Sequence, residues 1–277
     1  MAPSSGLENF GVPDDQKPRI IAVANQKGGV GKTTTAINLG AAIAAEGRNV
    51  LIVDLDPQGN ASTGLGLEPD DRRMTTYDLL LDEAPLVDVI HATGVKGLWI
   101  APATTDLSSA DIELVANEKR SFLLHDALRD PAAEQFAFDY VLIDCPPSLS
   151  LLTVNAMVAA HSVLVPLQSE FFALEGLSQL MLTIRQVRQA ANPGLRIEGV
   201  VLTMYDGRNR LAQQVERDAR DTLGDLVFKT IVPRNVRISE APSYAKPVLE
   251  YDPTSKGSAA YRELAQEIAF KRQVEPT

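Results

Sequence analysis

The stretch Ile20–Thr35, which reads IIAVANQKGGVGKTTT, decides how this chain folds. It starts as an apolar, β-branched run and passes through a turn with three glycines. It then continues into residues 36–43, where apolar side chains repeat at helical spacing. A strand, a tight loop and a helix N-terminus in this order form a cradle for phosphate, because backbone N–H groups and the helix dipole both favour an anion there. The stretch therefore predicts a nucleotide site.

Several residues of this loop have the chemistry that ATP and Mg²⁺ require. Its glycines let the backbone approach a phosphate, since no Cβ stands in the way. Lys32 can reach the β- and γ-phosphates, and the Thr33 hydroxyl can ligate Mg²⁺. We therefore expect ATP and Mg²⁺ as cofactors, with the nucleotide held by Gly28, Gly29, Val30, Gly31, Lys32, Thr33 and Thr34.

The loop departs from the common P-loop pattern at one position. Gln26 stands where that pattern has its first glycine, and a second lysine, Lys27, follows at the mouth of the loop. A plain glycine turn with two solvated lysines is the alternative interpretation, and the flanking strand and helix argue against it. A loop with two lysines in this arrangement resembles that of the deviant-Walker ATPases, which include the ParA/Soj partitioning proteins, MinD, the nitrogenase iron protein and the arsenite-pump ATPases.

Length and composition restrict the classes of protein to which this chain can belong. The 277 residues suffice for one large α/β domain, and 45% hydrophobic with 22% charged residues is typical of a globular protein. The one cysteine, Cys145, excludes a disulfide framework. It also argues against the iron protein, whose shared cluster needs two cysteine ligands from each subunit.

The two ends of the chain carry no targeting signal that we recognise. The N-terminus lacks a basic segment followed by an apolar core, and no apolar run reaches the roughly 18 residues of a membrane span. We expect a cytoplasmic protein with no membrane partner. Residues 1–18, with three prolines and two glycines, are expected to be a mobile tail, and residues 273–277 a second short tail.

The net charge of −10 is unevenly distributed along the chain. Residues 185–272 contain 15 Lys+Arg and 11 Asp+Glu, a net of +4, while the remainder contains 11 and 25, a net of −14. A local basic patch matters more than the total charge, because the Debye length is only about 8–10 Å. The C-terminal third is therefore a candidate nucleic-acid face, although a solvated basic surface has the same composition.

Apolar runs alternate with amphipathic segments along the chain. This alternation predicts an α/β fold of the P-loop NTPase type, with a mainly parallel twisted sheet and helices on both faces, in a single domain over residues 19–272. Beyond the first strand and helix, we expect strands at 50–56, 98–102, 140–144, 162–166, 196–204 and 226–232, and helices at 107–130, 149–160, 171–191, 209–223 and 257–272.

Three aspartates end predicted strands, and ligands in such sheets bind beyond the carboxyl ends of the strands. Asp144 ends an apolar strand and fits a Walker-B residue that holds Mg²⁺ through water. Asp54 and Asp56 end the second strand on the same side of it. By resemblance to the deviant-Walker ATPases, Asp56 positions the attacking water and Asp54 supports the magnesium site. A turn-forming pair before Pro57 is the alternative.

The same resemblance implies a sandwich homodimer in which Lys27 of each subunit reaches the nucleotide of the other. Catalysis would then involve Lys27, Lys32 and Asp56. A cation supplied in trans can speed phosphoryl transfer by about 10³–10⁵-fold.

Late motifs narrow the resemblance to ParA/Soj. Residues 233–243, PRNVRISEAPS, are similar to a motif of that family in which the backbone near Pro233 lines the adenine pocket. The resemblance also implies non-specific binding of double-stranded DNA through Arg208, Arg237 and Lys246, release by a ParB-like centromere-binding partner, and a location on the nucleoid.

Other classes remain as alternatives. A MinD-like protein would end in a basic amphipathic helix that binds lipid, whereas here Glu275 and Pro276 oppose both lipid binding and a helix. A relative that positions protein clusters is also open. A small-molecule ligase with the same ATP loop would need a substrate motif, and we find none.

Overall fold

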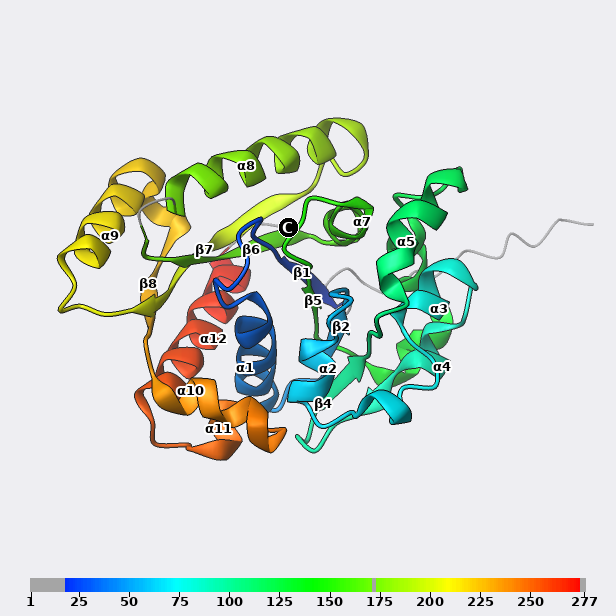
Figure 1. Ribbon diagram of the computed structural model, residues 1–277, viewed down its shortest axis with the longest axis horizontal. Helices are drawn as coiled ribbons and strands as arrows, with labels where there is room; N and C mark the ends of the chain where they lie inside the picture. The colour runs from blue at the N-terminus through cyan, green and yellow to red at the C-terminus, as the bar shows by residue number, and fades with distance from the viewer. Residues whose placement is uncertain (1–17, 171–172, 275–277) are drawn as a thin grey trace, which may run out of the picture.

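The computed structural model describes residues 18–170 and 173–274. Within these ranges the chain forms a sheet of eight strands in the order β3-β4-β2-β5-β1-β6-β7-β8 (Figure 1). The strands are β1 (Arg19–Val23), β2 (Val50–Asp54), β3 (His91–Ala92), β4 (Leu98–Ala101), β5 (Tyr140–Asp144), β6 (Ser162–Gln168), β7 (Arg196–Tyr205) and β8 (Val227–Pro233). Only the pairing of β3 with β4 is antiparallel.

The centre of the sheet consists of strands that are buried on both faces. β2 and β5 are buried at every position, as their continuous apolar runs predict for parallel strands. β1 lies between β5 and β6. The register sets Asp144 opposite Val23 on one side and opposite Asp54 on the other. The carboxyl ends of β1, β2 and β5 therefore meet at one point.

Helices cover both faces of this sheet. They are α1 (Lys32–Ala45), α2 (Asn60–Gly64), α3 (Thr76–Leu81), α4 (Leu86–Val89), α5 (Leu107–Glu113), α6 (Leu123–Ala127), α7 (Leu151–Ala159), α8 (Ala173–Ala190), α9 (Arg210–Leu223), α10 (Val236–Glu240), α11 (Val248–Tyr251) and α12 (Lys256–Val274). The helices α1, α11 and α12 pack on one face, and α5 to α9 pack on the other.

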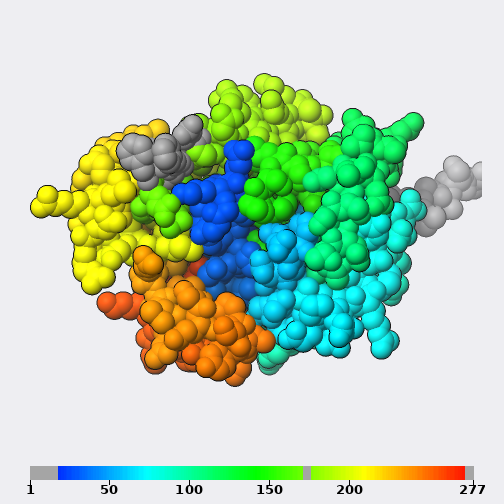
Figure 2. Space-filling view, viewed as in Figure 1, coloured from blue at the N-terminus to red at the C-terminus, as the bar shows by residue number. Residues whose placement is uncertain are grey.

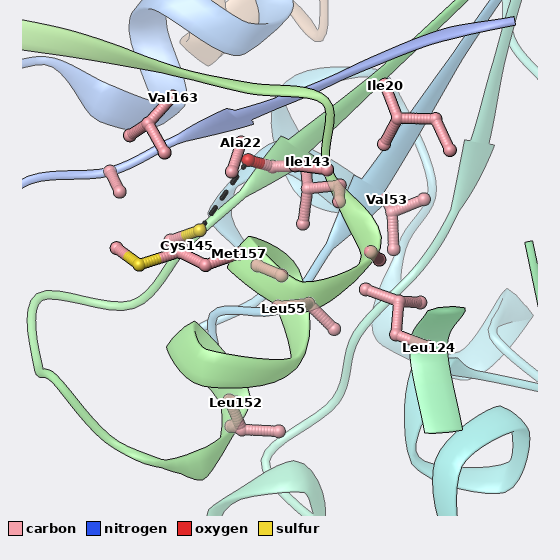
Figure 3. Close-up of a cluster of buried hydrophobic side chains, with 14 of the residues drawn as sticks. Ile20, Ala22, Val53, Leu55, Leu124, Ile143, Cys145, Leu152, Met157 and Val163 are labelled. Carbon is pink, nitrogen blue, oxygen red and sulfur yellow. Dashed lines mark hydrogen bonds between the residues drawn. The ribbon is translucent and has the colours of Figure 1, made fainter. Parts of the chain in front are cut away.

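Alternation along β1 divides the core into two layers, because successive side chains point to opposite faces. Ile21 and Val23 join the layer of α1 and α12, whereas Ile20 and Ala22 join the layer of α7. Figure 3 shows the second layer, in which Met157 of α7 lies near Cys145 and the Cys145 Sγ is 3.8 Å from the carbonyl oxygen of Ile143. The predicted α/β fold, with a mainly parallel sheet covered on both faces, is confirmed.

One predicted helix is interrupted. In place of a continuous helix over 107–130, α5 and a short 3₁₀ turn end at Ala116, and α6 begins at Leu123. The Asn155 side chain on α7 occupies the break, where it accepts from Leu124 N at 3.3 Å and donates to Arg120 O at 2.6 Å. Because these bonds satisfy backbone groups that a helix would otherwise pair, they stabilise the interruption.

The chain ends fall largely outside the described residues. The expected tails at 1–18 and 273–277 lie outside them apart from Pro18, Gln273 and Val274, and α12 reaches Val274. The domain boundaries stay predictions. No helix in the described ranges is both long and apolar enough to cross a membrane.

Candidate active site

The phosphate loop, residues 24–31, connects the end of β1 to the start of α1. Gly31 precedes the helix with φ 87°, a left-handed conformation that favours glycine. Neighbouring strands hold the loop: Asn25 Nδ2 donates to Pro166 O at 2.7 Å, and Thr203 Oγ1 donates to Val30 O at 2.8 Å. Within the described ranges, the backbone N–H groups of residues 28–31 donate no hydrogen bond, so they remain able to bind an anion.

Lys32 begins α1 with its side chain turned back over the loop. The residue is buried, and its Nζ donates to the carbonyl oxygen of Lys27 at 3.1 Å. Burial lowers the pKa of Lys32, while the charges of Asp144 and Asp56 act in the opposite direction. The amine therefore lies within the field of the acidic residues at the strand ends, where a phosphate would meet it.

Asp144 is buried at the end of β5, and neither of its carboxylate oxygens has a hydrogen-bond partner among the described residues. Burial raises the pKa of Asp144 well above its usual value, and the charge of Asp54 adds to this effect. The Thr33 hydroxyl and the Lys32 charge oppose it. Because an unpartnered buried carboxylate is costly, this residue is suited to a cation or to water that a cation holds.

Asp54 is buried beside Asp144, but its own oxygens are occupied. Oδ1 accepts from Asp56 N at 3.1 Å, and Oδ2 accepts from Ser62 N at 3.0 Å and Ser62 Oγ at 2.7 Å. Burial raises the pKa of Asp54 to about 6, while the Ser62 bonds lower it. Asp54 therefore fixes the start of the following loop and of α2, a structural role next to the magnesium site that the sequence predicts.

Asp56 lies in the loop between β2 and α2 and is nearly buried, at 8% exposure. Its Oδ1 accepts from Gln58 N at 3.0 Å. Its Oδ2 accepts no hydrogen bond within the part of the chain that the structure describes. One carboxylate oxygen thus remains available to bind water.

The Lys27 side chain is partly exposed and is paired with a carboxylate beyond the end of β6. Its Nζ is 2.6 Å from Glu170 Oε2, in an ion pair whose side chains are 37% and 48% exposed. Gln168 Nε2 donates to the other oxygen of Glu170 at 2.6 Å. The second lysine is therefore accessible at the surface and held by a carboxylate of its own subunit.

The predicted adenine side of the site lies where β7 and β8 end. Tyr205 pairs with Pro233, and Arg234 N donates to Tyr205 O at 3.0 Å. Met204, with φ 51°, has its terminal methyl 3.8 Å from the place where a Cβ on Gly31 would lie. Met204 thus lies close to the end of the phosphate loop, a proximity between segments far apart in the sequence that no local spacing predicts. In Figure 2 the dark blue atoms of the phosphate loop reach the surface near the centre of the view, above the α10–α11 segment (orange).

The three predicted DNA contacts are exposed, and two of them are in ion pairs. Arg208 is 90% exposed and binds Asp206 through two hydrogen bonds of 2.9 Å. Arg237, on α10, lies 2.9 Å from Glu240 and 3.3 Å from Asp252. Lys246 is exposed and forms no ion pair among the described residues. Within the described residues, no hydrogen bond or ion pair joins any of the three to the phosphate loop.

A glycine-rich loop before a helix, with a buried lysine and strand-end aspartates on a mainly parallel sheet, defines a P-loop ATPase. The family model described as "AAA domain" matches residues 18–197. Chromosome partitioning protein ParA of Caulobacter vibrioides is 59% identical over 255 residues, which is 92% of this chain and 95% of the relative. Sporulation initiation inhibitor protein Soj of Bacillus subtilis is 52% identical over 91% of this chain and 98% of the relative.

A solved structure of cobyrinic acid a,c-diamide synthase from Mycobacterium smegmatis with bound ADP and magnesium has a TM-score of 0.80 and 38% identity, covering 93% of this chain and 96% of that chain. The chain belongs to the ParA/Soj family of chromosome-partitioning ATPases, within the MinD/ParA superfamily. The resemblance noted in the sequence is thus confirmed.

Proposed function

We propose that this protein is a Mg²⁺-dependent ATP hydrolase for DNA segregation. ATP binding forms a sandwich homodimer, the dimer binds double-stranded DNA non-specifically on the nucleoid, and a ParB-like partner stimulates hydrolysis and release. One observation carries this proposal: Lys32, the unpartnered Asp144 carboxylate and Asp56 converge beside free backbone N–H groups. Membership in the ParA/Soj family supports DNA as the molecule that this protein helps to segregate.

The residues present fit ATP with Mg²⁺. The N–H groups of residues 28–31 and the Lys32 amine would hold the phosphates, and the backbone near Pro233 would line the adenine. Thr33 would ligate Mg²⁺ directly and Asp144 through water. No three His, Cys, Asp or Glu side chains of the described ranges gather to hold a metal by themselves, which suits an ion that keeps most of its water and binds phosphate oxygens. When bound, Mg²⁺ neutralises charge that develops on the phosphates.

The chain's own side chains then supply position and charge. Asp56 has a free carboxylate oxygen that would orient water toward the γ-phosphate. Lys32 would leave the Lys27 carbonyl and follow the transferred oxygens, because a phosphate is a stronger acceptor for an ammonium than a neutral carbonyl is. Lys27, at the surface, would exchange Glu170 for the nucleotide of the second subunit.

Non-specific DNA binding would use phosphate contacts alone. Arg208 and Arg237 would each exchange carboxylate partners for DNA phosphates. Each would therefore contribute less to the free energy of DNA binding than a cation without such a partner would. Lys246 has no such partner to lose within the described residues. Such contacts position a protein without reading base sequence.

The variant Asp56→Ala tests this proposal. It should bind ATP and form the dimer but hydrolyse ATP at least about 10²-fold more slowly, because the water loses its orienting group. Light scattering with Mg²⁺-ATP measures the dimer, and phosphate release measures turnover. Lys32→Ala is the control, and it should lose ATP binding altogether. An Asp56→Ala protein that stays monomeric with ATP would contradict the assignment.

The 38% identity to cobyrinic acid a,c-diamide synthase of Mycobacterium smegmatis favours one competing function, a small-molecule synthase. A cavity of about 490 Å³ lies between α9, β8 and α12, lined by mixed charges including Arg220, Lys229 and Glu267. It opens near the amino end of β8, whereas the phosphate loop lies at the carboxyl ends of the strands. ATP turnover that requires an added carboxylic acid, and not DNA or a protein partner, would favour the synthase. Binding to anionic vesicles would favour a MinD-like protein instead.

A further inference from the structure

Arg72 is a buried arginine in a polar, exposed turn. It is 7% exposed, although Asp71 and Arg73 on either side are exposed. Its guanidinium donates to Leu67 O from Nε at 3.0 Å and from Nη2 at 2.6 Å, to Ala103 O from Nη1 at 2.8 Å, and to Thr63 Oγ1 from Nη2 at 2.7 Å. All three acceptors are neutral oxygens, so the arginine serves here as a rigid set of donors and not as half of an ion pair.

Its acceptors belong to segments that enclose the Asp56 loop. Thr63 is on α2, Leu67 follows α2, and Ala103 follows β4. Ser62 links two of these segments again, because its Oγ donates to Asp54 and accepts from Ala103 N at 3.1 Å. Both backbone polar groups of Ala103 are therefore tied to the region of α2.

Gly59, at the end of the Asp56 loop, packs directly on this arginine. A Cβ on Gly59 would lie 2.4 Å from Arg72 Nη1 and 2.9 Å from Ala103 O. Thr63 Oγ1, which accepts from Arg72, donates in turn to Gly59 O at 3.2 Å. The guanidinium thus contacts the backbone of the Asp56 loop and is also connected to it through Thr63.

We propose that Arg72 is a positioning residue that fixes the loop Asp56–Gly59 and thereby the direction of the Asp56 carboxylate. This inference rests on the proposed function, in which Asp56 orients the attacking water. Among the described residues, Asp56 itself makes only local bonds: its carboxylate accepts from Gln58 N, its N–H donates to Asp54, and its carbonyl oxygen accepts from Gly59 N at 2.8 Å. The contacts of Gly59 with Arg72 and Thr63 therefore set the geometry of the loop. A lysine cannot replace this role fully, since it lacks the planar fork that reaches three segments at once.

Arg72→Ala should lower kcat for ATP hydrolysis by about 10- to 100-fold, the effect of moving a catalytic group by about 1 Å. The Kd for ATP should stay within about threefold of the parent value, because no contact of the phosphate loop is removed. Arg73→Ala is the matched control: it removes the same side chain from the next, exposed position and should leave both constants unchanged. Arg72→Lys should fall between the parent and Arg72→Ala.

Chemical rescue separates positioning from a general loss of structure. Guanidinium ion at concentrations far below denaturing should raise kcat of Arg72→Ala and leave that of Arg73→Ala unchanged. Thr63→Val is a second variant that keeps side-chain shape and breaks the link to Gly59. It should lower kcat with the Kd for ATP retained, and it carries the test if Arg72→Ala does not fold.

Parent protein that fails to hydrolyse ATP with Mg²⁺ would overturn the proposed function and this inference with it. Parent-like kcat in Arg72→Ala, or in Thr63→Val, beside active parent protein would overturn the role of Arg72 alone. A fall in kcat accompanied by an equal loss of ATP affinity and no response to guanidinium would also overturn it, since it would make Arg72 a scaffold residue.

Discussion

At the mouth of the phosphate loop, Lys27 is held by Glu170 of its own subunit at 2.6 Å. An exposed ion pair of this kind contributes only about 0.2–1 kcal/mol. If Lys27 must leave Glu170 to reach a second subunit, Glu170→Gln should favour the ATP-bound dimer by a factor of about 1.5 to 5 for each of the two lysines. Sedimentation at several protein concentrations with non-hydrolysable ATP measures this shift.

Lys27→Ala gives the opposite expectation for the same measurement. It should take up nucleotide but form no stable dimer, since its proposed partner phosphate belongs to the other subunit. A weaker dimer in Glu170→Gln would mean that Glu170 itself contributes to the interface. Normal dimerisation of Lys27→Ala would make Lys27 an ordinary loop lysine.

Single residues differ in how far the sequence could predict them. Lys32 and Asp144 were predictable because the phosphate loop and a strand-end position each specify a side chain by local spacing. Arg72 was not, because its acceptors Thr63 and Ala103 lie on different segments, one of them 31 residues away. In the sequence Arg72 stands among charged residues, a pattern that predicts a side chain exposed to solvent.

Two of the predicted DNA contacts lie on different segments, Arg208 in the turn between β7 and α9, and Arg237 on the short helix α10. Arg237→Glu, on α10, should lose DNA binding while ATP-dependent dimerisation persists. Arg208→Ala should weaken DNA binding less than Arg237→Glu does. It should also flatten the dependence of the logarithm of the DNA-binding constant on the logarithm of the salt concentration, whose slope is about −0.9 for each phosphate neutralised. DNA titrations at several salt concentrations, beside sizing of the dimer, measure both effects.

The matched control for these arginines is Arg48→Glu. Arg48 is also exposed and ion-paired, with Asp139 at 3.1 Å, but it precedes β2 and so lies at the opposite end of the sheet from the strand-end aspartates. It should bind DNA like the parent. Undiminished DNA binding by both Arg237→Glu and Arg208→Ala would put the DNA surface elsewhere.

Among the elements, long apolar strands were predicted best. β5 matches its predicted bounds, and β8 is shifted by one residue, since parallel strands buried on both faces leave a continuous apolar run in the sequence. The break between α5 and α6 was missed because Asn155, which stabilises it, comes from another helix. β3 has only two residues and leaves no periodic pattern to detect.

The stability of the whole molecule should depend on the buried acids of the site. Burial raises the pKa of Asp54 to about 6 and that of Asp144 well above its usual value. The folded state therefore holds protons that the unfolded state releases. This contribution to the free energy of unfolding is complete below about pH 4 and is lost as pH rises through about 6 and above.

Asp144→Asn removes one of these ionisations. Near neutral pH it should raise the free energy of unfolding of the nucleotide-free protein by about 1–2 kcal/mol, in the way that substitutions at strained functional sites often do. It should also abolish the stabilisation that Mg²⁺-ATP gives. Thermal unfolding with and without Mg²⁺-ATP across the pH range measures both. A less stable nucleotide-free Asp144→Asn protein would contradict the argument.

The position of β1, with β5 and β6 on its two sides, has a consequence for the timing of events at the site. The phosphate loop follows a strand that is paired on both sides, so little chain entropy is left to lose when an anion binds. The Asp56 loop is held by local bonds instead, to the Asp54 carboxylate and between Gly59 N and Asp56 O, and from the Thr63 hydroxyl to Gly59 O. In the proposed function, the nucleotide would therefore bind at a site that is already ordered, whereas hydrolysis would depend on the geometry of a locally held loop. The ATP-bound state should then last much longer than the binding step.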